Sequence, residues 1–197
     1  MSARKKNPKE QGQDAMAPEA DGPMFTVVKA CLEDLKWSYE VSERDDDRVV
    51  ITTRVRLEDL TCRTQFVLSE SRQRLGIFVY LPFAVPEERR MAVMEYLTRV
   101  NYRIFLAKFE FDLSDGELRA VCAVITEDAT LSLEMVQRMR RDAHGVMETY
   151  VPGILSIVYG HRTAQDAWQA LLDREAEEQA SVAGETPAGH EGEVATE

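Results

Sequence analysis

Apolar and polar residues alternate in six short runs along the chain, and alternation of this kind predicts half-buried β-strands. The first four runs are separated only by short polar connectors, which favours neighbouring antiparallel strands. Their inward positions are Trp37, Tyr39 and Val41; Val49, Ile51, Thr53, Val55 and Leu57; Cys62, Thr64, Phe66 and Leu68; and Leu75, Ile77, Val79 and Leu81. The pattern therefore predicts a four-stranded meander that ends at Pro82.

The last two runs predict a hairpin. Asp115-Gly116 suits a tight primed turn, in which both central residues have positive φ. The alternation enters the turn through Phe105, Ala107, Phe109, Phe111 and Leu113 and leaves it through Leu118, Ala120, Cys122 and Val124. The expected sheet thus has about six strands.

Helical spacing of apolar residues predicts four helices around these strands. They are expected to begin near Pro23, Pro86, Ser132 and Thr163, and Pro152 is expected to kink or interrupt the third. The inner face of the second helix is assigned to Met91, Met94, Leu97, Asn101 and Ile104. The order α-β4-α-β2-α-α lacks βαβ alternation, so the predicted fold class is α+β, an antiparallel β-sheet with helices packed on one face.

The two ends of the chain differ in composition from its middle. They are rich in Gly, Pro, Ala, Gln and Glu, which offer too little apolar surface to offset the entropy of ordering. We expect a disordered N-terminal arm over 1–22, an α+β domain over 23–160, a C-terminal amphipathic helix over 161–178 and a disordered acidic tail over 179–197.

Charge is distributed unevenly. The net charge is −11, and residues 173–197 contribute −7 of it, from eight acidic residues against Arg174. The only short basic cluster that the sequence suggests is Arg4 to Lys9, so we do not expect nucleic acid as a partner. No apolar run is long enough for a membrane helix and no secretory signal is evident, so we expect a cytoplasmic protein without a membrane partner.

Residues with catalytic or metal-binding potential have no supporting spacing. Cys31, Cys62 and Cys122 are odd in number and far apart, which is typical of buried thiols and not of a disulfide or zinc site. The three histidines lack partners at ligand spacing. Asp45-Asp46-Asp47 is interpreted as a polar hairpin turn, because a calcium loop needs further oxygen ligands. We therefore expect a non-enzymatic protein with no catalytic, cofactor-binding or metal site.

An apolar patch on the sheet is the strongest candidate for a binding surface. Phe78, Tyr80, Val121 and Ile125 occupy the face opposite the main apolar rows. If helices cover one face, this patch stays exposed, and such patches commonly mark protein partners or dimer contacts. Alternatively, the segment around Trp168 and Leu171 folds back and covers it. The candidate protein-binding surface comprises Phe78, Tyr80, Val121, Ile125, Trp168 and Leu171.

The residues Val100-Asn101, followed by the alternating stretch 107–112 and the turn 115–118, together with the element order, resemble the YbjN domain family of bacteria. The resemblance spans roughly 24–160. It implies a fold similar to that of the type III secretion chaperones and a role as a regulator of sensory transduction, and it supplies no catalytic residues. The predicted meander has one strand more than those chaperones usually show.

The leading hypothesis is a cytoplasmic protein-binding module, whose partner is another protein or a second copy of the chain as a homodimer. One alternative is a secretion chaperone for an effector protein. Another is a small-ligand-binding protein or enzyme with a pocket between sheet and helices, where Arg54, Arg56, Arg63 and Glu110 would converge.

Overall fold

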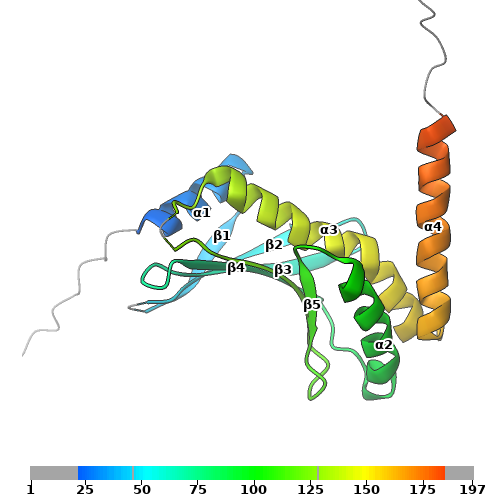
Figure 1. Ribbon diagram of the computed structural model, residues 1–197. Coiled ribbons are helices and arrows are strands. Elements are labelled where there is room, and N and C mark those ends of the chain that lie inside the picture. Colours follow the sequence, from blue (N-terminus) through cyan, green and yellow to red (C-terminus); the bar gives the residue numbers. More distant parts are fainter. Residues whose placement is uncertain (1–21, 46, 128, 185–197) are drawn as a thin grey trace, which may run out of the picture.

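The computed structural model describes residues 22–45, 47–127 and 129–184, and Figure 1 shows their arrangement. The elements follow the predicted order. They are α1 (Pro23–Asp34), β1 (Tyr39–Arg44), β2 (Val49–Arg56), β3 (Thr61–Ser69), β4 (Arg74–Tyr80), α2 (Glu87–Arg103), β5 (Lys108–Phe111), β6 (Leu118–Ile125), α3 (Leu133–Val158) and α4 (Ala164–Gly184).

The strands form one antiparallel sheet in the order β1-β2-β3-β4-β6-β5. Because β6 pairs with β4, the β5–β6 hairpin continues the meander after the α2 excursion. The register places Ile51, Phe66, Ile77 and Cys122 side by side across four strands. All four side chains are buried, so this row faces the helices. The predicted α+β class is confirmed.

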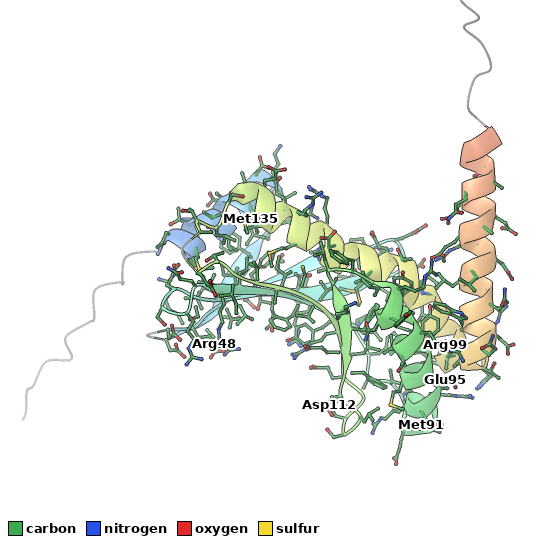
Figure 2. All side chains as sticks on the ribbon, viewed as in Figure 1. Arg48, Met91, Glu95, Arg99, Asp112 and Met135 are labelled. Atoms are coloured by element: carbon green, nitrogen blue, oxygen red, sulfur yellow. The ribbon has the colours of Figure 1, made fainter. Side chains whose placement is uncertain are left out.

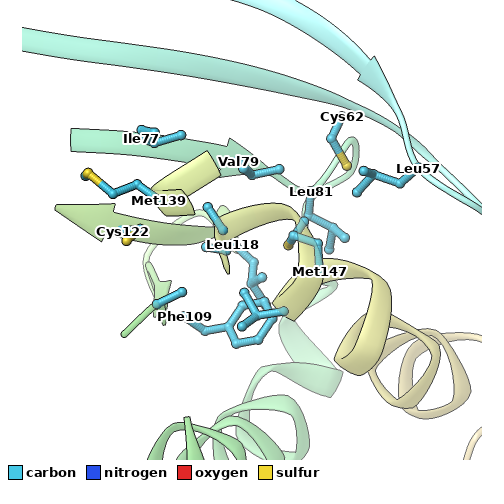
Figure 3. Close-up of a cluster of buried hydrophobic side chains, with 14 of the residues drawn as sticks. Leu57, Cys62, Ile77, Val79, Leu81, Phe109, Leu118, Cys122, Met139 and Met147 are labelled. Atoms are coloured by element: carbon cyan, nitrogen blue, oxygen red, sulfur yellow. The ribbon is translucent and has the colours of Figure 1, made fainter. Parts of the chain in front are cut away.

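The helices cover one face of the sheet. Helix α3 crosses β4 and β6, α1 packs beside it, and α2 lies at the β5 end (Figure 1). Met139 and Met147 of α3 share the buried cluster with Ile77, Val79 and Leu118 (Figure 3). Apolar burial between α3 and the sheet therefore stabilises the fold.

A carboxylate from the sheet caps the first helix. Glu70, beside the β3–β4 turn, accepts hydrogen bonds from the backbone N–H groups of Met24 (3.2 Å) and Phe25 (2.9 Å). A negative charge at this end also opposes the positive pole of the helix dipole. The start of the chain's first helix is thereby fixed next to one end of the sheet.

The inner face of α2 was predicted wrongly: the buried stripe is shifted by about one residue from the predicted one. Met91 is 65% exposed and lies on the outside of the helix (Figure 2). Leu97 is buried as predicted, whereas the other predicted members are only half-buried. The buried stripe comprises Val93, Tyr96, Leu97 and Val100. The sequence of α2 contains two overlapping apolar stripes, one that starts at Met91 and one that starts at Val93. The second, with its branched and aromatic side chains, occupies the core.

The predicted primed turn is also wrong. Gly116 has φ of 84°, but Asp115 is not among the residues with positive φ. The backbone N–H of Gly116 donates to the carbonyl of Asp112 (2.9 Å), and the N–H of Asp112 donates to the carbonyl of Glu117 (2.9 Å). The loop therefore has four residues, a length for which positive φ at the last residue alone is sufficient. Phe105 stays outside the hairpin, 90% exposed, in the connection from α2.

The last two helices differ in detail from the prediction. Ser132 caps α3 by accepting the N–H of Met135 (3.1 Å), and the helix continues through Pro152 without interruption. It curves along the sheet (Figure 1). Helix α4 extends to Gly184, beyond the predicted end at residue 178. The remainder of the predicted arm and tail, residues 1–21 and 185–197, lies outside the described residues.

Candidate docking face

One face of the sheet carries no helix among the described residues, and we call it the open face. The sheet curves so that the helices lie on its convex side and the open face is concave (Figure 1). Side chains alternate between the two faces along each strand. The register therefore places three rows on the open face: Val50, Val67, Gly76 and Ala123; Thr52, Gln65, Phe78 and Val121; and Arg54, Arg63, Tyr80 and Arg119.

The apolar part of the open face is a groove of about 740 Å³. Its floor is shaped by Gly76, because a Cβ atom there would lie 2.7 Å from Cε2 of Phe78. The Phe78 ring therefore lies along the sheet over Gly76. Ile125 stands at the rim and is 67% exposed. Besides these residues, the groove is lined by Val67, Arg74, Leu75, Ala123 and Val124.

Arginines share the open face with the apolar groove, and Arg74 lines it. The open-face positions of β2, β3, β4 and β6 hold no aspartate or glutamate, and their five arginines are Arg54, Arg56, Arg63, Arg74 and Arg119. Arg63 stacks on the ring of Tyr80 at 4.0 Å, and Arg119 lies over Phe78 at 4.7 Å. Cation–π contacts of this kind hold guanidinium groups against a surface.

The two edge strands supply counter-charges to this face: Glu110 on β5, and Glu40 and Glu43 on β1, which lie opposite Thr52 and Val50. Glu110 accepts a hydrogen bond from Nε of Arg119 at 2.7 Å. Partial burial lowers the pKa of Arg119, but its hydrogen bonds to Glu110 and Tyr80 outweigh burial, so the pKa lies above its ordinary value. Arg63 pairs with Glu117 at 3.7 Å. Among the described residues, Arg54, Arg56 and Arg74 have no ion-pair partner.

The structure places four of the six predicted surface residues on one face, with Tyr80 and Ile125 at opposite ends of the β4–β6 pairing. Phe78 and Val121 are cross-strand partners, and Tyr80 and Ile125 lie on the same strands and the same face. Trp168 and Leu171 lie elsewhere, on α4, which packs against α2 and α3. Leu171 is buried there, and the ring of Trp168 lies 5.5 Å from the guanidinium of Arg103. The C-terminal helix therefore does not cover the open face.

The predicted convergence of arginines occurs on the other side of the sheet from the expected one. Arg54 and Arg63 are cross-strand partners, and Glu110 lies on the same face through its contact with Arg119. This face is open, whereas the expected pocket was between sheet and helices. Sequence reasoning also missed Arg74 and Arg119, although strict alternation along their strands is the signal that assigns both to this face.

On the helix-covered side of the sheet, a buried histidine of α3 packs against β3. Nε2 of His144 lies 2.9 Å from Oγ1 of Thr64, and both residues are buried. Burial, with the nearby charge of Arg140, lowers the pKa of His144 to about 4. The imidazole is therefore neutral at neutral pH. Its ring packs edge-on against Trp37 at 5.7 Å, which is the environment of a core residue.

The cysteines and acidic turns are likewise structural. Cys31, Cys62 and Cys122 are free and buried, and burial raises the pKa of Cys62 and of Cys122 to about 11. Such thiols stay protonated and unreactive. Asp45 accepts the backbone N–H groups of Asp47 (3.0 Å) and Arg48 in the β1–β2 turn. Within the described residues, no group of three or more metal-binding side chains occurs.

Asn101, at the end of α2, ties the helix to the edge strand. Its side-chain amide donates to the carbonyl of Phe109 (3.0 Å) and its side-chain oxygen accepts the N–H of the same residue (2.8 Å). Lys108 donates from Nζ to the carbonyl of Asn101 (2.8 Å). The Asn101 side chain thus satisfies the outward-facing N–H and carbonyl groups of Phe109 as a neighbouring strand would. It thereby protects this edge of the sheet from pairing with another chain.

The fold and the family agree. The YbjN family model, described as "Putative bacterial sensory transduction regulator", matches residues 25–156. The chain belongs to this family. The match covers all of the sheet and ends within α3, so the open face lies inside it and α4 lies outside. No curated protein matches the chain. In the part of the chain that the structure describes, none of the helices has the length and apolarity needed to cross a membrane.

Proposed function

We propose that this YbjN protein is a non-enzymatic regulator that works by docking a partner polypeptide on its open face. One observation carries the proposal: the open face has an apolar groove that no described element covers. Soluble proteins rarely expose large contiguous apolar patches unless these bind something. The groove also has the composition of an interface, with an aromatic and aliphatic centre and Arg74 in its lining.

The proposal assigns no catalytic role. The buried thiols remain protonated and the buried imidazole remains neutral, so neither group is poised for nucleophilic or acid–base chemistry. Of the carboxylates on the open face, Glu110 is engaged by Arg119 and Glu43 by Arg48. We place the docking event in the cytoplasm. A second copy of the chain, another regulator and an exported effector are all polypeptides, so each satisfies the proposal, and the secretion-chaperone role is its narrowest form.

Size-exclusion chromatography with light scattering tests the proposal on the full chain purified from its native cell. The wild-type protein is expected to elute as a homodimer or with a stoichiometric partner. Ile125→Asp is expected to reduce that mass to the monomer, because it places a charge at the rim of the groove. Tyr159→Asp is the matched control, since Tyr159 is 63% exposed and lies at the end of α3. A wild-type monomer without partner contradicts the proposal, and so does equal dissociation by both variants.

A further inference from the structure

We infer that the segment docked on the open face is an acidic amphipathic peptide. In this arrangement its apolar side chains enter the groove at Phe78 and Ile125, and its carboxylates pair with the arginines of the adjacent row. The inference rests on the proposed docking function and specifies the chemistry of the partner.

Charge is the first argument. The chain as a whole carries −11, yet the open-face positions of its four inner strands are exclusively neutral or basic. Arg54 and Arg56 are exposed and have no ion-pair partner among the described residues. The two edge strands place Glu40, Glu43 and Glu110 on the same face. Glu43 pairs with Arg48 and Glu110 with Arg119, so unpaired positive charge is in excess on this face. An excess of one sign favours a partner of the opposite sign, both in rate of association and in specificity. The open face is thus complementary to carboxylates.

The layout of the face is the second argument. Same-face neighbours along a strand are about 7 Å apart. The row of Val67 and Gly76 is followed by the row of Phe78 and Val121, and then by the arginine row. On β4 and β6 two apolar rows therefore lie directly beside the basic row, whereas β2 and β3 place Thr52 and Gln65 in the second row. An amphipathic segment that lies across the strands can place an apolar stripe on the first two rows and an acidic stripe on the third.

The alternative ligand for arginines beside aromatic rings is single-stranded nucleic acid, whose bases stack on free ring faces. The rings here are already occupied. Arg63 stacks on Tyr80, which is only 9% exposed, and Arg119 lies over Phe78, which lies along Gly76. Of the arginines without an ion-pair partner among the described residues, Arg74 lines the aliphatic groove. These contacts favour a peptide carboxylate over a base.

Binding of short fluorescent peptides, measured by anisotropy, tests the inference. The probes are a peptide with an apolar stripe of Leu and Phe and a flanking stripe of Glu, the same peptide with Lys in place of Glu, and an oligouridine. The acidic peptide is expected to bind at least about tenfold more tightly than the lysine peptide and the oligouridine, with a preference that shrinks as salt is added.

Two charge-reversal variants provide a matched comparison. Arg54→Glu changes the open face, whereas Arg138→Glu makes the same change at an exposed position of α3. We expect Arg54→Glu to weaken the acidic peptide about tenfold or more and Arg138→Glu to leave its affinity within about twofold. Both variants are checked for native thermal unfolding, so that a loss of binding is not a loss of fold.

The results separate this inference from the docking function. If the lysine peptide binds as tightly as the acidic one and Ile125→Asp abolishes that binding, docking holds and the acidic partner is wrong. Preference for the oligouridine, equal effects of the two arginine variants, or no binding of the acidic peptide also overturns the inference. The docking function itself is decided by the mass measurement on the native protein.

Discussion

Replacing Gly153 with alanine is expected to loosen the contact between α2 and α3. Gly153 lies in α3 where the helix passes the buried Tyr96 of α2. A Cβ atom at this position would lie 2.2 Å from the hydroxyl oxygen of Tyr96 and 2.4 Å from its Cζ atom. Gly145, two turns earlier in the same helix, has no atom within 4 Å of such a Cβ and provides the control.

The magnitude follows from three contributions. Inserting a methyl group into a filled core costs about 1–3 kcal/mol. The tyrosine hydroxyl also donates to the carbonyl of Tyr150 (3.2 Å), and losing this bond costs about 1 kcal/mol. Alanine gains up to about 1 kcal/mol over glycine within a helix. We therefore expect Gly153→Ala to lower the free energy of unfolding by about 1–3 kcal/mol and Gly145→Ala to raise it by about 0.5–1 kcal/mol.

Urea unfolding followed by circular dichroism measures both variants against the wild type. The two alanine substitutions share a helix and a chemical change, so propensity cancels in their comparison. If Gly153→Ala is as stable as Gly145→Ala, the close packing of Tyr96 on α3 is refuted.

Three further predictions concern the buried polar groups and the edge strand. Because the pKa of His144 is about 4 in the folded chain and about 6.5 when unfolded, the unfolded state binds more protons between these values. Acidification from pH 7 to pH 4 should then lower the free energy of unfolding by about 3 kcal/mol. In urea titrations at several pH values, His144→Gln should remove this loss, whereas the exposed-site control His161→Gln should keep it. An equal pH dependence of stability in the two variants would contradict the prediction. Asn101→Leu should destabilise by about 1–3 kcal/mol, because the N–H and carbonyl of Phe109 lose their partners; a hydrogen-exchange rate at Phe109 equal to that of the wild type would argue against this role. The three cysteines should react with a thiol reagent only on unfolding, as the buried thiol of Cys62 stays protonated; rapid native labelling would show that the thiols are accessible.

Much of the fold is encoded locally and was predicted from the sequence. Alternation along β2 and β3 gives both the strands and the side that faces the helices, because each position depends only on its neighbours in the chain. The inner face of α2 was predicted wrongly, because Met91 and Val93 both start plausible stripes and only packing against α3 selects one. The turn at Gly116 differs for a similar reason, since the loop length depends on hydrogen bonds that begin at Asp112.

The candidate site was predicted in its apolar half and in part of its basic half. Phe78 and Val121 could be assigned to one face from alternation. Arg74 and Arg119 are far apart in the chain, and they share the face with Arg54 because β6 pairs with β4 across the α2 excursion. That pairing is a tertiary feature. For this reason only Arg54, Arg56 and Arg63 could be grouped from the sequence, and they were assigned to the wrong side of the sheet.

The central claim is that a partner polypeptide occupies the open face in the cell. Its most direct test is a photo-crosslinking amino acid placed at Ile125 on the open face, and separately at Tyr159, in the full chain expressed in its native cell. We expect a crosslinked polypeptide from position 125, identified by mass spectrometry and rich in acidic and apolar residues at the attached site, with little or none from position 159. Crosslinks of equal yield at both positions, or none at position 125, would contradict it.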